Sequence, residues 1–186
     1  MNVFNHFQII IGLTLIIYFN ACSQISNDLI VLKFLTEHNE CPKGINCFND
    51  YYKALDYSKR INKPIFIMFI GYACVSDRYF ENNVITNPQV RKIIKENYVV
   101  VFLYVDDKKK LPIKEQITID YLGKQKKIKT IGNKWAYFEF INFQQVSQPY
   151  FVLLSNTEEL LTKPIGRVRK NEINKFINFL KCGLKQ

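Results

Sequence analysis

The stretch from Lys63 to Val84 constrains the fold of this chain more than any other. It begins with an apolar run, Ile65 to Ile70, flanked by Pro64 and Gly71, which is typical of a short, fully buried strand. Cys74 follows at once, in a polar segment that predicts the start of a helix. Unpaired N–H groups at a helix N-terminus favour a thiolate, so they lower the pKa of a cysteine placed there. The pattern therefore indicates a reactive thiol between a strand and a helix.

The segment Gly71-Tyr-Ala-Cys-Val-Ser-Asp-Arg resembles the active-site segment of thioredoxin-like domains. The resemblance is strongest to the C-terminal domain of thiol:disulfide interchange proteins of the DsbD type, which read Gly-(Trp/Tyr)-x-Cys-Val-Asn-Cys-Arg-x-x-Glu-x-x-Val. The matching residues are Gly71, Cys74, Val75, Arg78 and Val84, with Glu81 close to its usual place. The second cysteine of the family is Asp77 in this chain. The resemblance implies an α/β, thioredoxin-like fold, in which a central mixed β-sheet is flanked by helices on both faces.

A second informative stretch is Ser147-Gln-Pro-Tyr-Phe-Val-Leu-Leu. Gln148-Pro149 resembles the cis-proline loop that faces the reactive cysteine in thioredoxin-like domains. Such a loop exposes backbone groups, so that an extended substrate strand can pair beside the thiol. The resemblance implies that the catalytic residues are Cys74, Asp77 and Pro149. It also implies a substrate-binding set, which comprises Tyr72, Ala73, Gln148 and Tyr150.

Asp77 changes the chemistry that the resemblance implies. In two-cysteine relatives the first thiolate attacks a substrate disulfide, and the second cysteine resolves the mixed disulfide. Asp77 cannot form a sulfur bond, so the second thiol must come from elsewhere. The candidates are a small external thiol, a partner protein, or one of Cys41, Cys47 and Cys182.

The carboxylate of Asp77 also affects the thiol. A negative charge near Cys74 raises the pKa of the thiol, whereas Asp77 could instead cap the helix and direct part of its charge away. The sequence leaves both arrangements open. In either one, Cys74 is expected to be less acidic than the first cysteine of a two-cysteine site.

Residues 1–22 are predicted to be a signal segment outside the fold. The apolar run from Ile9 to Phe19 is too short for a membrane span and has the length of a signal-peptide core. Ala21-Cys22-Ser23 resembles a lipoprotein signal, in which Cys22 would be lipidated. A secretory signal without lipid, or a buried N-terminal helix, are the alternatives.

Residues 23–48 are predicted to be an N-terminal extension. Its turn-rich loop has Cys41 at one end and Cys47 at the other, which predicts either a small structural disulfide or two unpaired thiols. No metal site is expected, because the chain has only two histidines, His6 and His38, and no second pair of ligands lies near the two cysteines. No cofactor is expected either.

Residues 49–186 are predicted to form the thioredoxin-like domain. Apolar periodicity and capping residues predict helices over residues 49–62, from Asn87 and over 173–180, with a buried strand over 98–105. Thr130-Ile-Gly-Asn-Lys-Trp resembles a recurrent segment of thioredoxin-like relatives, which implies that it leads into a helix ending at Phe143. Residues 107–130 form a lysine-rich insertion with little periodicity, which predicts a solvated, mobile loop or, alternatively, a docking surface for a partner. Trp135 is expected to be a packing anchor, and Cys182 a small buried apolar residue.

These features predict an exported protein that performs thiol–disulfide exchange, reducing or isomerising disulfides of cell-envelope proteins through one cysteine. The expected location is the periplasm or cell envelope, with a membrane anchor through lipid on Cys22. Expected partners are proteins with disulfides or thiols, and a small thiol or a membrane reductase as electron donor. Nucleic acid is not expected despite the net charge of +10, because no nucleic-acid-binding motif is present.

Two other functions fit the same residues. The first is a redox-silent binding module of thioredoxin-like fold in the cell envelope, which would use the Pro149 edge and the lysine-rich insertion as contact surfaces. The second is a sensor in which Cys74 reacts with peroxide.

Overall fold

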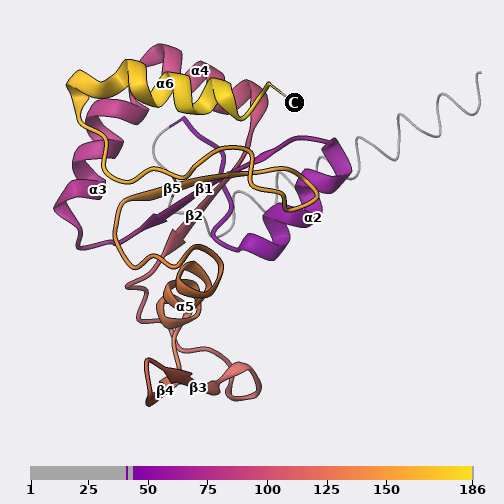
Figure 1. Ribbon diagram of the computed structural model, residues 1–186, viewed down its shortest axis with the longest axis vertical. Helices are drawn as coiled ribbons and strands as arrows, with labels where there is room; N and C mark the ends of the chain where they lie inside the picture. The colour runs from indigo at the N-terminus through magenta and orange to yellow at the C-terminus, as the bar shows by residue number, and fades with distance from the viewer. Residues whose placement is uncertain (1–40, 42–43, 186) are drawn as a thin grey trace, which may run out of the picture. The chain divides into compact units, whose positions relative to one another are not determined.

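The computed structural model describes Cys41 and residues 44–185 (Figure 1). The predicted signal segment with Cys22, and most of the predicted extension, lie outside the described residues. The central strand β1 (Ile65–Ile70) pairs in parallel with β2 (Val99–Tyr104) and antiparallel with β5 (Tyr150–Leu154). All three strands are buried along their whole length. Continuous apolar strands of this kind require cover on both faces of the sheet.

Helices supply that cover. They are α2 (Tyr51–Ile61), α3 (Val75–Phe80), α4 (Pro88–Asn97), α5 (Ile131–Phe143) and α6 (Ile173–Cys182), with a π-helical turn η1 (Glu81–Ile85) and 3₁₀ turns η2 (Ile113–Glu115) and η3 (Lys170–Glu172). Helices α4 and α6 lie along one face and α2 and α5 along the other (Figure 1). Phe66 packs on Phe176 of α6, whereas Phe69 packs on Phe138 of α5. The predicted mixed sheet with helices on both faces is confirmed.

Local capping explains where these helices begin. The Asp50 side chain accepts a hydrogen bond from the N–H of Lys53 at the start of α2. Asn87 caps α4 in the same way, and Pro88 occupies the first helical position, where its missing N–H costs nothing. Thr130 caps α5 through Asn133 N–H. The predicted starts of α2 and α4 are therefore confirmed to within two residues.

The prediction for residues 107–130 is wrong in part, because the segment has regular structure. Strands β3 (Ile117–Tyr121) and β4 (Lys124–Ile128) form an antiparallel hairpin. A small apolar cluster of Leu111, Ile119 and Ile128 holds this hairpin. The alternating apolar residues of β3 favour a strand with one buried face. β4 is mostly lysine, and it forms a strand because the turn brings it alongside β3, with which it pairs.

The core extends further towards the N-terminus than residue 49. Ile45, Cys47 and Phe48 are buried, and Phe48 pairs with Val101 of β2. A disulfide joins Cys41 and Cys47, so the paired alternative is the one that the structure contains. Among the described residues, no helix has the length and apolar character to cross a membrane.

Candidate active site

Cys74 lies where the central strand passes into a helix. β1 ends at Ile70, and Cys74 is the N-cap residue of α3, with a half-buried side chain. The carbonyl oxygen of Cys74 accepts hydrogen bonds from the N–H groups of Asp77 and Arg78 at 3.1 and 3.2 Å. The predicted strand–cysteine–helix order is confirmed, and Cys74 lies partly exposed beyond the carboxyl end of the central strand.

Asp106 fixes the loop that carries the cysteine. Its carboxylate accepts hydrogen bonds from the Tyr72 N–H at 2.8 Å and from the Ala73 N–H at 3.1 Å. A side chain on Gly71 would have its Cβ 3.1 Å from the same carboxylate, so glycine permits this close approach. The Tyr72 ring stacks on Tyr104, with centroids 3.9 Å apart. Sequence reasoning did not identify Asp106, although it follows β2, whose carboxyl end lies beside that of β1.

Asp77 occupies the next turn of the helix, and its side chain is fully buried. Its Oδ2 accepts a hydrogen bond of 2.6 Å from the Gly71 N–H, outside the helix. The capping alternative is therefore not the arrangement found, because the carboxylate turns back to the strand end. Oδ1 has no hydrogen-bond partner among the described residues. Burial raises the pKa of Asp77 above its usual value, although the hydrogen bonds from Gly71 and Cys74 oppose this.

The pKa of Cys74 is raised, in contrast to the effect expected from a helix N-terminus alone. Burial is the largest cause, and the Asp77 side chain adds to it through hydrogen bonding and charge. Hydrogen bonds from the Asp77 and Ser76 N–H groups act in the opposite direction. The result agrees with the expectation that Asp77 makes this thiol less acidic. At neutral pH the thiol form of Cys74 is therefore favoured.

Glu139 brings a second buried carboxyl group to the same region. It projects from α5, is fully buried, and accepts a hydrogen bond of 2.9 Å from the Gln148 side chain. Its other oxygen has no hydrogen-bond partner among the described residues. Burial raises the pKa of Glu139 to about 8, and the charge of Asp77 contributes. Sequence reasoning missed this residue, since a single glutamate in an apolar helix gives no local sign of where it points.

The Gln148–Pro149 peptide bond is cis, as the resemblance predicted. Tyr150 is opposite Phe69 in the β1–β5 pairing, so the antiparallel register brings Pro149 opposite Ile70, beside the turn that carries Cys74. The Gln148 side chain links this loop to Glu139. The structure therefore gathers Cys74, Asp77, Gln148 and Pro149 at one end of the sheet.

The four predicted substrate-binding residues differ in exposure. Tyr72 and Ala73 are exposed and Gln148 is half-buried. Tyr150 is buried, and its ring packs against Phe69 and Phe143. A bound substrate could therefore touch the first three side chains, whereas the Tyr150 ring is engaged in packing.

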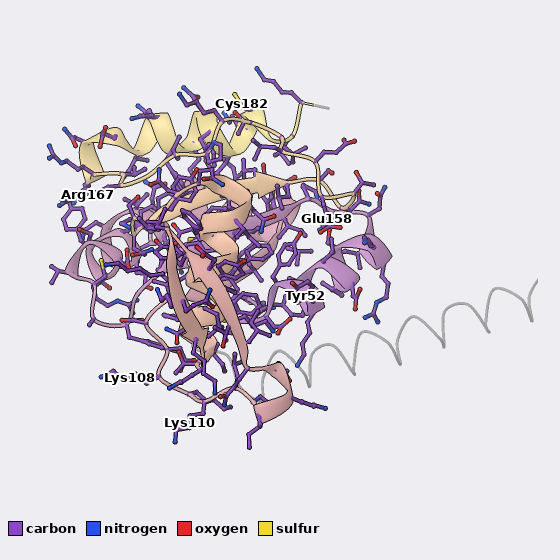
Figure 2. The ribbon with its side chains drawn as sticks, turned by 60° about the horizontal axis from the view of Figure 1, so that its bottom comes forward. Tyr52, Lys108, Lys110, Glu158, Arg167 and Cys182 are labelled. Carbon is purple, nitrogen blue, oxygen red and sulfur yellow. A yellow bond between two sulfur atoms is a disulfide. The ribbon has the colours of Figure 1, made fainter. Side chains whose placement is uncertain are left out.

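The other cysteines lie away from Cys74. Cys41 and Cys47 are paired, and the intervening Gly44 lies against Arg91 of α4. Cys182 ends α6 (Figure 2) and interacts with Tyr98, which precedes β2. Cys74 lies beyond the other end of that strand, which is about 20 Å long at the usual rise per residue. Cys182 is exposed, so the prediction of a buried residue was wrong.

At the level of sequence, no protein-family model matches the chain, and no curated protein does either. Solved structures do match. A structure described as DsbH Oxidoreductase superposes with a TM-score of 0.52 at 14% identity, over 79% of this chain and 92% of that chain.

Two other matches have TM-scores below 0.5. One is the C-terminal domain of Neisseria meningitidis DsbD in its reduced form, with a TM-score of 0.47 at 13% identity, over 72% of this chain and 96% of that one. The other is a thioredoxin from Thermus thermophilus, with a TM-score of 0.46 at 16% identity, over 73% of this chain and 84% of that one. The likeness to DsbH Oxidoreductase, at 14% identity, shows the fold alone: this chain has a thioredoxin-like fold.

Proposed function

We propose that the protein exchanges thiols and disulfides with other proteins through Cys74 alone. The observation that carries this proposal is the position of a partly exposed thiol at the start of α3, at the same end of the sheet as the Gln148–Pro149 loop. The structural likeness to DsbH Oxidoreductase supports it. Proteins with disulfides or thiols are the proposed substrates.

The reaction needs more than one thiol, of which the chain supplies Cys74. The Cys74 thiol gives up its proton, and the thiolate attacks one sulfur of the substrate disulfide. The S–S bond breaks, the leaving sulfur takes up a proton, and a mixed disulfide with Cys74 remains. If a second thiol of the substrate then attacks the substrate sulfur of this mixed disulfide, Cys74 is released and a new substrate disulfide forms, so the disulfide is isomerised. If an external thiol attacks the Cys74 sulfur instead, the reduced substrate is released, and a second external thiol then frees Cys74, so that the two external thiols end as a disulfide.

The second thiol is proposed to come from outside the chain. Asp77 holds the place of a resolving cysteine, and among the described residues the remaining cysteines are in a disulfide or at the far end of α6. A small thiol or a membrane reductase could act as the donor. The raised pKa of Cys74 favours slow attack at neutral pH and faster attack as the pH rises.

A disulfide-scrambled protein provides the test. The chain should reduce the disulfides of this protein repeatedly only when glutathione is present, whereas reshuffling, in which the substrate supplies the second thiol, should proceed without it. Cys74→Ser should abolish the activity, whereas Cys182→Ser, which removes the other free thiol of the described residues, should retain it. Activity that survives Cys74→Ser would refute the proposal.

A redox-silent binding module is the alternative, and one observation favours it: burial and Asp77 both disfavour the Cys74 thiolate. In that case the exposed Tyr72 and the Pro149 edge would bind partners without sulfur chemistry. Capture of the same partners by wild-type protein and by Cys74→Ser would support it. A Cys74 that reacts with peroxide would instead yield a sulfenic acid. A labelling reagent that reacts with sulfenic acids but not with thiols can detect it.

We further propose that the chain is exported to the cell envelope, with lipid attached to Cys22. The support is the signal-like sequence of residues 1–22. Expression with a radiolabelled fatty acid tests this directly: wild-type protein should carry label, and Cys22→Ser should carry none.

A further inference from the structure

The insertion of residues 107–130, here called the basic hairpin, has no part in the proposed exchange reaction. It contains eight lysines against three acidic residues, so its net charge of +5 is half of the chain's +10. All eight lysines are exposed, and within the described part of the chain none forms a salt bridge with a carboxylate. Lys108 and Lys110 point outward in Figure 2. The charge is therefore available to something outside the domain.

The hairpin is held in a defined position. The Leu111 N–H bonds to the Lys129 carbonyl at 2.9 Å, and the Ile131 N–H bonds to the Lys109 carbonyl at 2.9 Å. The Tyr121 ring contacts the Phe140 ring of α5, with centroids 4.9 Å apart. The two backbone hydrogen bonds close the base of the hairpin, and the Tyr121 contact holds the end of β3 next to the turn against α5, so the backbone of the hairpin has a defined position on the domain.

The turn at the tip of the hairpin contains an apolar residue, Leu122, that does not pack in the core of the domain. Leu122 and Gly123 join the strands with φ of 54° and 76°, the geometry of a type I′ turn, in which Asn-Gly is preferred. A leucine is disfavoured in this left-handed conformation. Leu122 is nevertheless 75% exposed, and Ile113 on η2 is 88% exposed. Neither side chain contributes to the core of the domain.

We propose that the basic hairpin binds a membrane surface of anionic lipids, with Leu122 inserted at the level of the headgroups. Lysines attract the negative headgroups, and an exposed apolar side chain among them can enter the interface. This proposal goes beyond the exchange reaction and does not depend on it, nor on lipid at Cys22.

The chemistry of the hairpin favours lipid over other anionic partners. All its basic residues are lysines, whereas nucleic-acid recognition favours the forked geometry of arginine. Its aromatic ring, Tyr121, is occupied by Phe140 and by Lys126, whose Nζ is 4.7 Å from the ring centre, so it offers no free stacking platform. The central part of a protein–protein interface is poor in lysine, and here lysines surround the exposed apolar residues.

Vesicle sedimentation tests the proposal. The full chain with Cys22→Ser, which excludes attached lipid, is mixed with vesicles of phosphatidylcholine alone or with added phosphatidylglycerol. The added anionic lipid should increase binding, and high salt should remove that increase. Lys124→Gln/Lys126→Gln/Lys127→Gln should weaken the anionic-lipid binding by about tenfold or more.

Two comparisons make the test specific. Lys59→Gln/Lys92→Gln/Lys95→Gln makes the same change of net charge on exposed residues of α2 and α4 and should bind almost as wild type. Leu122→Asn suits the turn, so it should leave thermal unfolding intact or improve it, while weakening binding severalfold. Equal binding by the two lysine triples, unchanged binding by Leu122→Asn, or association with RNA or an acidic protein without any with vesicles would each overturn the proposal.

Discussion

The buried carboxylate of Asp77 accepts a hydrogen bond of 2.6 Å from the Gly71 N–H. Because Gly71 follows β1 and Asp77 lies in α3, this bond joins the strand end to the helix across the turn that carries Cys74. A two-cysteine site has a sulfur at the position of Asp77. In this chain Asp77 has two effects: its hydrogen bond joins strand and helix, and its charge raises the pKa of Cys74. The first two predictions below separate these effects.

Asp77→Asn should make Cys74 more acidic. The amide oxygen can still accept from the Gly71 N–H, while the negative charge that raises the pKa of the thiol is removed. Alkylation of Cys74 at neutral pH should become severalfold faster, because a lower pKa leaves a larger fraction of the thiol as thiolate. Peptide-level alkylation rates measure this, and Cys182 in the same molecule serves as the control. An unchanged or slower rate at Cys74 would show that Asp77 does not govern the thiol.

Asp77→Cys should restore a two-cysteine site. Its spacing from Cys74 is that of the family motif, so oxidation should give an intramolecular disulfide, seen by mass spectrometry as the loss of two hydrogens. The Gly71 hydrogen bond is lost, and the free energy of unfolding should fall by about 1–2 kcal/mol. Ser76→Cys, one position earlier, is the control and should form no such bond. Persistent glutathione adducts on Cys74 in the Asp77→Cys protein would contradict the inferred geometry.

Glu139 should make the protein less stable as the pH rises. Its pKa is raised to about 8 in the folded protein from 4.5, so between these values the folded state binds more protons than the unfolded state. The free energy of unfolding therefore falls with increasing pH across this window, by an amount on the order of 2–5 kcal/mol. The raised pKa values of Asp77 and Glu81 act in the same direction.

Glu139→Gln tests that contribution because the amide resembles the protonated acid and can still bond to Gln148. Urea unfolding at pH 5 and pH 8 should show a smaller loss of stability in the variant than in the wild type. Parallel losses in the two proteins would mean that Glu139 is ionised throughout, or is solvated.

Asp106→Ala should loosen the cysteine loop. Two N–H groups, of Tyr72 and Ala73, lose their acceptor, so their hydrogen exchange should become faster by about tenfold, while stability falls by only about 1 kcal/mol because water replaces the carboxylate. Asp107→Ala is the matched control, since its side chain bonds instead to the Lys109 N–H. If the hydrogen-exchange rate of the Tyr72 N–H were the same in both variants, Asp106 would not be what holds the cysteine loop.

The parts of the fold that depend on local chemistry could be predicted from the sequence. The apolar run of β1, the Asn87-Pro88 helix start and the Gln148-Pro149 loop are each determined by neighbouring residues. Cys74 could be placed for the same reason, because a strand and a helix start flank it directly.

The remainder depends on packing between distant segments. Glu139 belongs to the site only because α5 packs on β1 near the cis-proline loop, which no local pattern encodes. Cys182 follows Leu180 by two positions, and that spacing turns it away from the buried stripe of α6. The lysines of β4 gave no strand signal, since that strand is stabilised by its pairing with β3.

The central claim is that Cys74 exchanges with an outside thiol, and thiol mapping across a glutathione redox series tests it most directly. The chain is equilibrated at each redox ratio, quenched by alkylation, and read peptide by peptide by mass spectrometry. We predict that Cys74 is trapped as a mixed disulfide with glutathione, while no species joins Cys74 to Cys182 and the Cys41–Cys47 disulfide persists. If Cys74 stays a free, slowly alkylated thiol at every ratio, the exchange function is contradicted and the binding-module alternative takes its place.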